Sequence, residues 1–375
     1  MSCKKWSLSC LNAFIRDSVC YMEKEICLHG ITAFRLYEQW DRIVPDLFDK
    51  PRARSLRSCR LPHVIEMSDR LAKLGIHDGP YHLMVGNRRY EHEASGVITH
   101  VCTRQLPARS LIRVAPGVLC PSPELCFLQL AQMACLEGAG KRDGNAGRSF
   151  CRFPWLDEVD LALLGFELCG TYLRDEDGLD NIRNTERPLT SRVKISALLT
   201  ALPGYPGIEL ARRSLELVQD GSHSLMETAM ALQLTGPRRV GGMGLPKGEL
   251  NCQIVTTRGD RWVDLGWKDL RVGVEYQGRL WHTDAERDDR RRNRIVGAGM
   301  NLFIVRFDDL RSKDLFDDLV SDLSRALGYR VRIRSQDHRA RQMALWTRVL
   351  PPARSDEGKY VSNQSACGWG RPYCP

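Results

Sequence analysis

Two short alternating runs near the C-terminus constrain this chain more than any other feature. The runs 262–267 (Trp-Val-Asp-Leu-Gly-Trp) and 272–277 (Val-Gly-Val-Glu-Tyr-Gln) each alternate with a period of two. This period is typical of a half-buried β-strand. If the runs form an antiparallel hairpin about the intervening turn, Asp264 lies directly opposite Glu275. The sequence therefore predicts two carboxylates on neighbouring strands.

The apolar residues of both runs support this register. A slip of one residue would move them off the core face, which we expect to contain Val263, Leu265, Val272, Val274 and Tyr276. Like charges directly opposite each other destabilise a sheet. A divalent cation would compensate for them, because Mg²⁺ and Mn²⁺ bind hard oxygen ligands. The alternative is a solvated acidic face without a ligand.

Polar residues continue beyond the second run. Gln277 shares the face of Glu275, and His282 follows shortly after Gly278. Thr283 and Glu286 have the spacing of a capping box that opens a helix at about 284–297. This helix is rich in arginine, at Arg287, Arg290, Arg291, Arg292 and Arg294. Acidic residues are interleaved with these arginines, so a solvated, salt-bridged face is the alternative to phosphate contact.

The surrounding periodicity predicts an α/β domain. An apolar run at 252–257 precedes the hairpin, and a buried strand is predicted at 301–307. An amphipathic helix is predicted at about 308–327. Together with a helix upstream of the hairpin, the predicted order is helix, three-stranded meander, helix, strand, helix.

These residues resemble a known nuclease domain. Asp264, the stretch 274–278 (Val-Glu-Tyr-Gln-Gly), Trp281-His282, the arginine-rich helix and the strand after it resemble the very-short-patch-repair-like endonuclease domain. That domain belongs to the PD-(D/E)XK, or restriction-endonuclease-like, superfamily. The upstream stretches 224–228 and 242–251 also resemble the entrance helix and loop of this family. The resemblance covers about residues 216–335 and implies a metal-dependent phosphodiesterase acting on DNA.

The resemblance also implies roles for individual residues. Asp264 matches the central metal-ligand aspartate and Glu275 the acidic position of the second motif element. Glu227 matches an acidic residue of the entrance helix, and His282 a histidine that lies near the scissile phosphate and transfers a proton. Gln277 departs from the pattern, because many members of the superfamily have Lys there. Hydrolysis assisted by Mg²⁺ or Mn²⁺ is the expected chemistry. The nucleic-acid contacts are expected from Arg287, Arg290, Arg291 and Arg294.

The rest of the chain carries fewer distinctive motifs. Residues 1–135 are expected to form a mixed α/β region with winged-helix character, including strands at 81–85 and 111–118 and a helix at 125–136. Short stretches at 26–35, 103–107 and 122–131 resemble the N-terminal half of antitoxins from abortive-infection (AbiEi-type, type IV) toxin–antitoxin systems. Residues 136–215 are predicted to be a helical connector. The turn-rich composition of residues 352–375 predicts a disordered tail.

Net charge indicates the expected partner, and cysteine usage indicates the expected compartment. Lys and Arg exceed Asp and Glu by 55 to 46, a net charge of +9, which favours a polyanionic partner. We expect DNA, with RNA as an alternative that charge does not distinguish. The 14 cysteines contain no C-x-x-C pair, so we expect buried, reduced thiols in the cytoplasm. No signal peptide or apolar membrane span is predicted.

Two functions of different class follow. The first is a metal-dependent DNA endonuclease in defence, repair or mobile-element biology. The second is a DNA-binding regulator or antitoxin-like protein, with a toxin or operon partner, whose nuclease fold is inactive. The acidic residues favour the enzyme, whereas Gln277, in place of lysine, keeps the regulator as an alternative. A homodimer is compatible with both.

Overall fold

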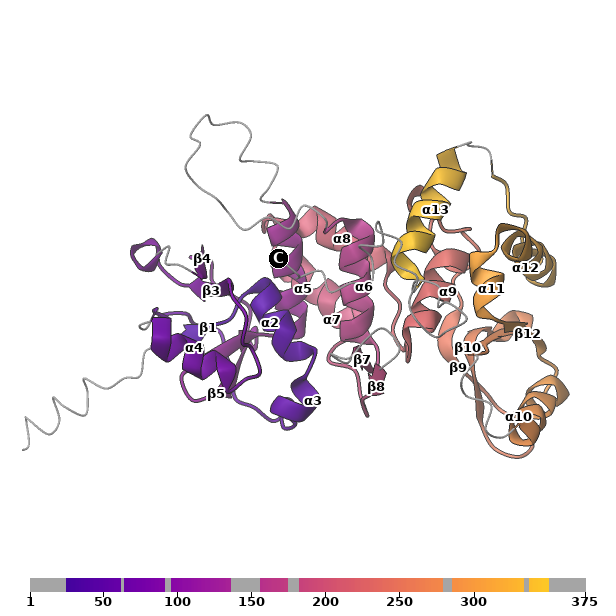
Figure 1. Cartoon of the computed structure of the whole chain (residues 1–375), viewed down its shortest axis with the longest axis horizontal. Helices are drawn as coiled ribbons and strands as arrows, with labels where there is room; N and C mark the ends of the chain where they lie inside the picture. Colours follow the sequence, from indigo (N-terminus) through magenta and orange to yellow (C-terminus); the bar gives the residue numbers. More distant parts are fainter. Residues whose placement is uncertain are drawn as a thin grey trace, which may run out of the picture. The chain divides into compact units, whose positions relative to one another are not determined.

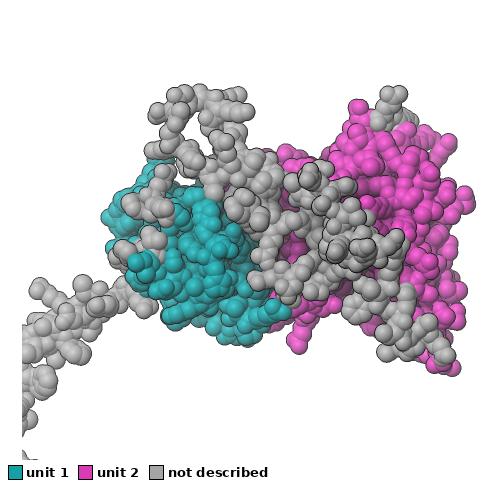
Figure 2. All heavy atoms as spheres, in the orientation of Figure 1, with its two compact units in different colours: residues 1–122 teal, residues 123–375 magenta. Residues whose placement is uncertain are grey.

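The computed structural model describes residues 25–61, 64–91, 96–135, 156–174, 182–278, 285–333 and 337–350. His282 and the tail from residue 351 lie outside these ranges. The chain has a mixed α/β architecture and divides into two compact units, residues 1–122 and 123–375 (Figures 1 and 2). The sequence prediction of an α/β fold is therefore confirmed at this level. No helix in the described ranges is long and apolar enough to cross a membrane.

The first unit contains a four-stranded mixed sheet and a separate parallel strand pair. The sheet has the order β1-β6-β5-β2, formed by β1 (Ile26–Cys27), β6 (Val118–Pro121), β5 (Leu111–Ala115) and β2 (Arg52–Ala53). The parallel pair consists of β3 (Tyr81–Val85) and β4 (Val97–Val101). The helices are α2 (Gly30–Tyr37), α3 (Trp40–Ile43) and α4 (Val64–Ala72).

Two strand predictions for this unit have different outcomes. The strand at 81–85 is confirmed, and all five of its residues are buried. The single strand predicted at 111–118 is wrong, because the chain turns back within it and forms the antiparallel pair β5–β6. The turn uses Gly117, whose φ of 67° is in the left-handed region that glycine adopts without a steric cost.

The second unit begins with a helical part. Helix α5 (Pro123–Cys135) packs against α6 (Glu158–Cys169), α7 (Arg192–Ala201) and α8 (Ile208–Leu217). A small antiparallel pair, β7 (Tyr172–Arg174) and β8 (Ile182–Asn184), interrupts these helices. The segment predicted as a helical connector is therefore not purely helical. Its helices belong to the same compact unit as the C-terminal sheet.

The C-terminal sheet has the order β12-β11-β10-β9. Strands β9 (Glu249–Ile254), β10 (Arg261–Trp267) and β11 (Val272–Tyr276) form an antiparallel meander, and β12 (Asn301–Val305) lies parallel to β11. Helix α9 (Leu225–Thr235) precedes the meander, and α10 (Ala285–Gly297) connects β11 to β12. The predicted order of elements is thus confirmed. The helix predicted at 308–327 is divided at Ser312, which is extended, into α11 (Phe307–Arg311) and α12 (Lys313–Ala326). Helix α13 (Asp337–Val349) follows and packs against α9.

The hairpin register is as predicted. Leu265 pairs with Val274 and Trp267 with Val272, so one step further Asp264 stands opposite Glu275. Four of the five predicted core residues are almost fully buried, namely Val263, Leu265, Val272 and Val274. Tyr276 is the exception: it ends the strand and is only partly buried.

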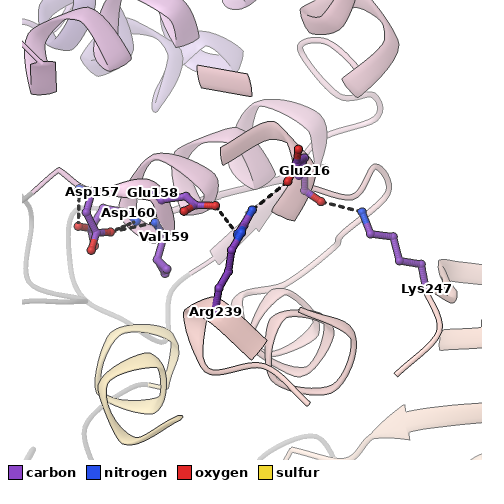
Figure 3. A network of polar contacts seen from close by, with 7 residues as sticks. All are labelled: Asp157, Glu158, Val159, Asp160, Glu216, Arg239 and Lys247. Carbon is purple, nitrogen blue, oxygen red and sulfur yellow. Dashed lines mark hydrogen bonds and ion pairs between the residues drawn. The ribbon is translucent and has the colours of Figure 1, made fainter. Parts of the chain in front are cut away.

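A polar network joins the helical part to the C-terminal part of the second unit (Figure 3). Arg239, in the short 3-10 helix η3 (Arg238–Val240), pairs with Glu158 of α6 at 2.6 Å and with Glu216 of α8 at 2.9 Å. Lys247 donates to the backbone carbonyl of Glu216 at 2.6 Å. These contacts connect the segment between α9 and β9 with α6 and α8.

Candidate active site

The centre of the candidate site is the pair Asp264 and Glu275 on β10 and β11. The Asp264 carboxylate is half-buried, and its Oδ2 accepts a hydrogen bond of 2.7 Å from the backbone N–H of Tyr276. Glu275 is only 6% exposed. The antiparallel register brings them together, and the hydrogen bond from the opposite strand fixes one oxygen of Asp264.

Arg291 of α10 supplies a positive charge to this pair. A guanidinium nitrogen lies 2.9 Å from Oε1 of Glu275, and Arg291 also donates to the Trp262 carbonyl at 2.5 Å. Oε1 of Glu275 is nevertheless a buried atom without a hydrogen bond. Both observations hold if the contact is an ion pair without hydrogen-bond geometry. Arg291 therefore meets the charge of this oxygen, but no hydrogen bond fixes it.

Glu227 approaches the site from the first turn of α9. It is 8% exposed, and its Oε2 accepts hydrogen bonds from the backbone N–H of His223 at 2.8 Å and from Nδ2 of Asn251 at 2.7 Å. The Ser224 hydroxyl donates to Oε1 at 3.1 Å and also accepts from the Glu227 backbone N–H, which caps the helix. Glu227 is thus held in one orientation by several donors.

The three carboxylates interact electrostatically. Burial, followed by the charge of Asp264, raises the pKa of Glu227 to about 7. Burial also raises the pKa of Asp264 and of Glu275, although Arg291 acts in the opposite direction on both. Raised pKa values of neighbouring carboxyl groups are typical of sites that bind a cation or transfer a proton.

Asn251 is a site residue that the sequence analysis did not single out. Its backbone has a φ of 47°, inside β9, and it stands opposite Asp264 between the pairs Val263–Cys252 and Leu265–Leu250. Its Nδ2 donates both to Glu227 and to the carbonyl of Gly221. The only sequence signal would have been an asparagine, a residue that tolerates the left-handed region, inside a predicted strand.

The other predicted residues have mixed outcomes. Gln277 is half-buried directly after β11, and its backbone N–H donates to the Val305 carbonyl at 2.7 Å. On α10, Arg290 is exposed and Arg294 is half-buried, one helical turn apart. His282 and the side chain of Arg287 lie outside the described residues.

The donor set fits a hard divalent cation. Asp264 and Glu275 offer carboxylate oxygens, one of which is buried without a hydrogen bond. Within the ranges that the structure describes, a set of three candidate ligand atoms within 4.8 Å of one another occurs elsewhere, at three histidines of the first unit. At the acidic site, fewer than three candidate ligand atoms therefore lie this close together. That number is compatible with Mg²⁺, which is commonly held by one or two carboxylates together with substrate phosphate.

Comparison with known proteins adds little about function. No family model and no solved structure matches the chain. It is similar to two uncharacterized proteins of Mycobacterium tuberculosis, MT2308 of strain CDC 1551 / Oshkosh and Rv2248 of strain H37Rv. Each is 29% identical over 125 residues, which are 32% of this chain and 44% of the relative. The chain thus matches less than half the length of these relatives.

Proposed function

We propose that residues 216–335 form a restriction-endonuclease-like domain of the PD-(D/E)XK superfamily that hydrolyses phosphodiester bonds in DNA with Mg²⁺ or Mn²⁺. The observation that carries the proposal is the opposed pair Asp264 and Glu275, with Glu227 oriented beside them from the preceding helix. The order of helices and strands around this pair is the one predicted from the periodicity of the sequence. A sheet face that serves only as a scaffold has no need to gather two buried carboxyl groups and the half-buried Asp264, whose charge repels both.

The residues would divide the work as follows. Asp264 and Glu275 hold the cation, whose chemistry is to offset developing charge on the phosphate and to activate water. The Tyr276 N–H keeps one Asp264 oxygen in place, so that the other is directed to the ligand. Glu227, with a pKa of about 7, exchanges a proton near neutral pH. Gln277 orients water by hydrogen bonding, and His282 transfers a proton.

Substrate binding is assigned to α10. Arg290 and Arg294 lie one turn apart on this helix, Arg290 exposed and Arg294 half-buried. Arginine binds phosphate oxygens through a planar, forked set of donors. Arg291 is directed at Glu275 instead, so its role is to neutralise the site before the cation and substrate arrive. Arg287 completes the predicted set.

A second function is supported by a specific observation. The ion pair between Arg291 and Glu275 already neutralises one carboxylate inside the protein, and Gln277 lacks the charge of the usual lysine. Both features suit a DNA-binding regulator or antitoxin-like protein whose nuclease fold holds DNA without cleaving it. In that case the first unit would contribute to DNA binding, and a toxin or operon product would be the partner.

Cleavage assays with matched variants test the proposal. Purified full-length protein is incubated with supercoiled plasmid and with mismatched duplex DNA, in Mg²⁺, in Mn²⁺ and in EDTA. Asp264→Asn removes a ligand charge, and Asp269→Asn is the matched control, because Asp269 is exposed at the turn of the same hairpin. We expect metal-dependent cleavage that Asp264→Asn lowers by at least about 100-fold and Asp269→Asn leaves intact.

The outcomes separate the two functions. Cleavage that persists in Asp264→Asn would remove this site from consideration. No cleavage by the wild type, combined with salt-sensitive DNA binding that both variants retain, would establish the regulator. RNA of the same sequence as the duplex, tested in parallel, decides between the two nucleic acids.

A further inference from the structure

A second, chemically different site lies in the first unit. His29, His82 and His100 each offer one ring nitrogen, and these nitrogens all lie within 4.8 Å of one another. His29 and His82 are each 1% exposed, whereas His100 is half-buried. The three histidines lie far apart in the sequence, so their convergence is a product of the fold.

The backbone explains why they converge. His29 precedes α2, and its N–H donates to the His82 carbonyl at 3.0 Å. The His82 N–H in turn donates to the Thr32 hydroxyl at 2.8 Å. His100 lies on β4, which pairs with β3 in parallel so that His100 stands beside Met84, two residues beyond His82 on the same face. The ring positions are therefore set by strand pairing and by the start of a helix.

The rings themselves are close. His82 Nδ1 lies 2.8 Å from His100 Nε2. The rings of His29 and His100 are stacked, with centroids 3.8 Å apart and planes at 8°. In a tetrahedral zinc site with Zn–N bonds of 2.0–2.1 Å, two ligand nitrogens are separated by about 3.3 Å. To admit the ion, the His82–His100 pair would open by about half an ångström. The ring of His29, now stacked on that of His100, would also rotate so that its lone pair, which lies in the ring plane, meets the ion.

We propose that His29, His82 and His100 form a binding site for Zn²⁺ or a similar late transition-metal ion, which holds the start of α2 against the β3–β4 pair. Three imidazoles suit such ions and do not suit Mg²⁺ or Ca²⁺, which require oxygen ligands. Three protein ligands also leave a fourth position of a tetrahedral ion for water or another small ligand. The site is therefore separate from the carboxylates of the second unit in both place and ion preference, and it does not depend on the proposed nuclease function.

Metal titration of the full chain tests the proposal. The protein is purified without a histidine tag, stripped with chelator, and titrated with Zn²⁺ by calorimetry in the presence of millimolar Mg²⁺. Co²⁺ serves as a spectroscopic probe, because tetrahedral Co²⁺ has intense visible absorption bands. We expect stoichiometric Zn²⁺ binding that Mg²⁺ does not compete with, a tetrahedral Co²⁺ spectrum, and a rise in thermal midpoint with Zn²⁺.

Variants locate the ion. His100→Gln is the primary variant, since His100 is half-buried and its loss disturbs packing least, and His82→Gln is the second. His77→Gln is the matched control, because His77 lies in the same unit and is exposed. A variant with both Asp264→Asn and Glu275→Gln removes the acidic site. We expect His100→Gln to weaken Zn²⁺ binding by more than about 100-fold, since even residues that only support a ligand contribute 10- to 100-fold.

The binding measurements on these variants either establish or overturn the histidine site. Loss of binding in His100→Gln, with binding retained in the His77 and the carboxylate variants, establishes the site. Circular dichroism of the stripped variants separates this loss from misfolding, and if His82→Gln does not fold, His100→Gln alone decides. Absence of Zn²⁺ binding by the wild type, or binding that is lost only in the carboxylate variant, would overturn the proposal and leave the histidines as a hydrogen-bonded core cluster.

Discussion

At the scale of single residues, Asn251 has the most demanding position in the candidate site. Its backbone is left-handed within a strand, and its side chain donates to Glu227 and to the Gly221 carbonyl. These bonds orient a buried carboxylate whose pKa is about 7. An asparagine can satisfy both requirements, because it tolerates positive φ better than other non-glycine residues and carries two amide donors.

Substitution of Asn251 separates the two contributions. Asn251→Gly keeps the conformational freedom and loses the hydrogen bonds, so we expect a decrease of about 1–2 kcal/mol in the free energy of unfolding. Asn251→Ala should lower the free energy of unfolding by about 1 kcal/mol more, because alanine is strained in the left-handed region. Urea unfolding at pH 7 measures both, with Val255→Ala, 76% exposed just beyond the same strand, as the control. Equal losses in the two variants would show that the backbone conformation is not a constraint.

At the scale of secondary structure, the strands of the C-terminal sheet approach one another closely. A Cβ atom at Gly266 of β10 would lie 2.5 Å from Sγ and 2.6 Å from Cβ of Cys252 on β9. Cys252 belongs to the core cluster with Val263 and Ile295, so it has little room to move. Glycine at this position therefore allows the core to pack beneath the carboxylate pair.

Two glycine substitutions should have opposite effects. Gly266→Ala overpacks the sheet, and we expect it to cost about 1–3 kcal/mol. Gly297→Ala, at the end of α10, meets no atom within 4 Å and should be neutral or stabilising by up to about 1 kcal/mol, because alanine restricts the unfolded chain. Thermal unfolding compares the two variants. A Gly266→Ala protein as stable as the wild type would mean that β9 and β10 can separate without loss.

Helix α10 gives a prediction about DNA binding. Replacing Arg290 and Arg294 with glutamine removes two candidate phosphate contacts, so the slope of log affinity against log salt should fall by about 1 per residue. The control carries the same charge change at Arg212 and Arg325, exposed residues of α8 and α12. Fluorescence anisotropy with a labelled duplex gives both slopes. Equal slopes in the two double variants would place the DNA elsewhere.

At the scale of the whole molecule, the helical part and the C-terminal sheet of the second unit form one compact body. Besides the Arg239 network, Arg348 of α13 pairs with Asp157, which caps α6, and lies 3.9 Å from Asp160. Burial, followed by the charge of Asp157, raises the pKa of Asp160 to about 6. These contacts connect elements almost two hundred residues apart. The titration of Asp160 therefore reports on the second unit as a whole.

Asp160 should make stability depend on pH. Because its pKa is raised on folding from 3.8 to about 6, the folded state holds this proton more tightly, and the stability it contributes is complete below pH 4 and lost as the pH rises through 6. Asp160→Asn removes this dependence. The free energy of unfolding of the wild type relative to Asp160→Asn should fall by up to about 3 kcal/mol between pH 4 and pH 7. Parallel pH dependence in both proteins would contradict the assignment.

Periodicity along the chain was sufficient to predict the hairpin and the pair of carboxylates. A period of two assigns each residue of a strand to one face, and the apolar residues of both runs admit one register, in which Asp264 stands opposite Glu275. This information is local, because it is contained in the two runs and the turn between them, residues 262–277. The break at Ser312 and the turn at Gly117 were missed, since apolar periodicity continues across both.

The residues that complete each site come from distant parts of the chain, and packing between elements brings them there. The contact of Asn251 with Glu227 spans 24 residues, and Arg291 reaches Glu275 because α10 packs back over the sheet. The cluster of His29, His82 and His100 has no signature spacing, and the β3–β4 pairing together with the start of α2 brings its rings together. Such contacts depend on how separate elements pack, and periodicity within one element carries no information about its neighbours.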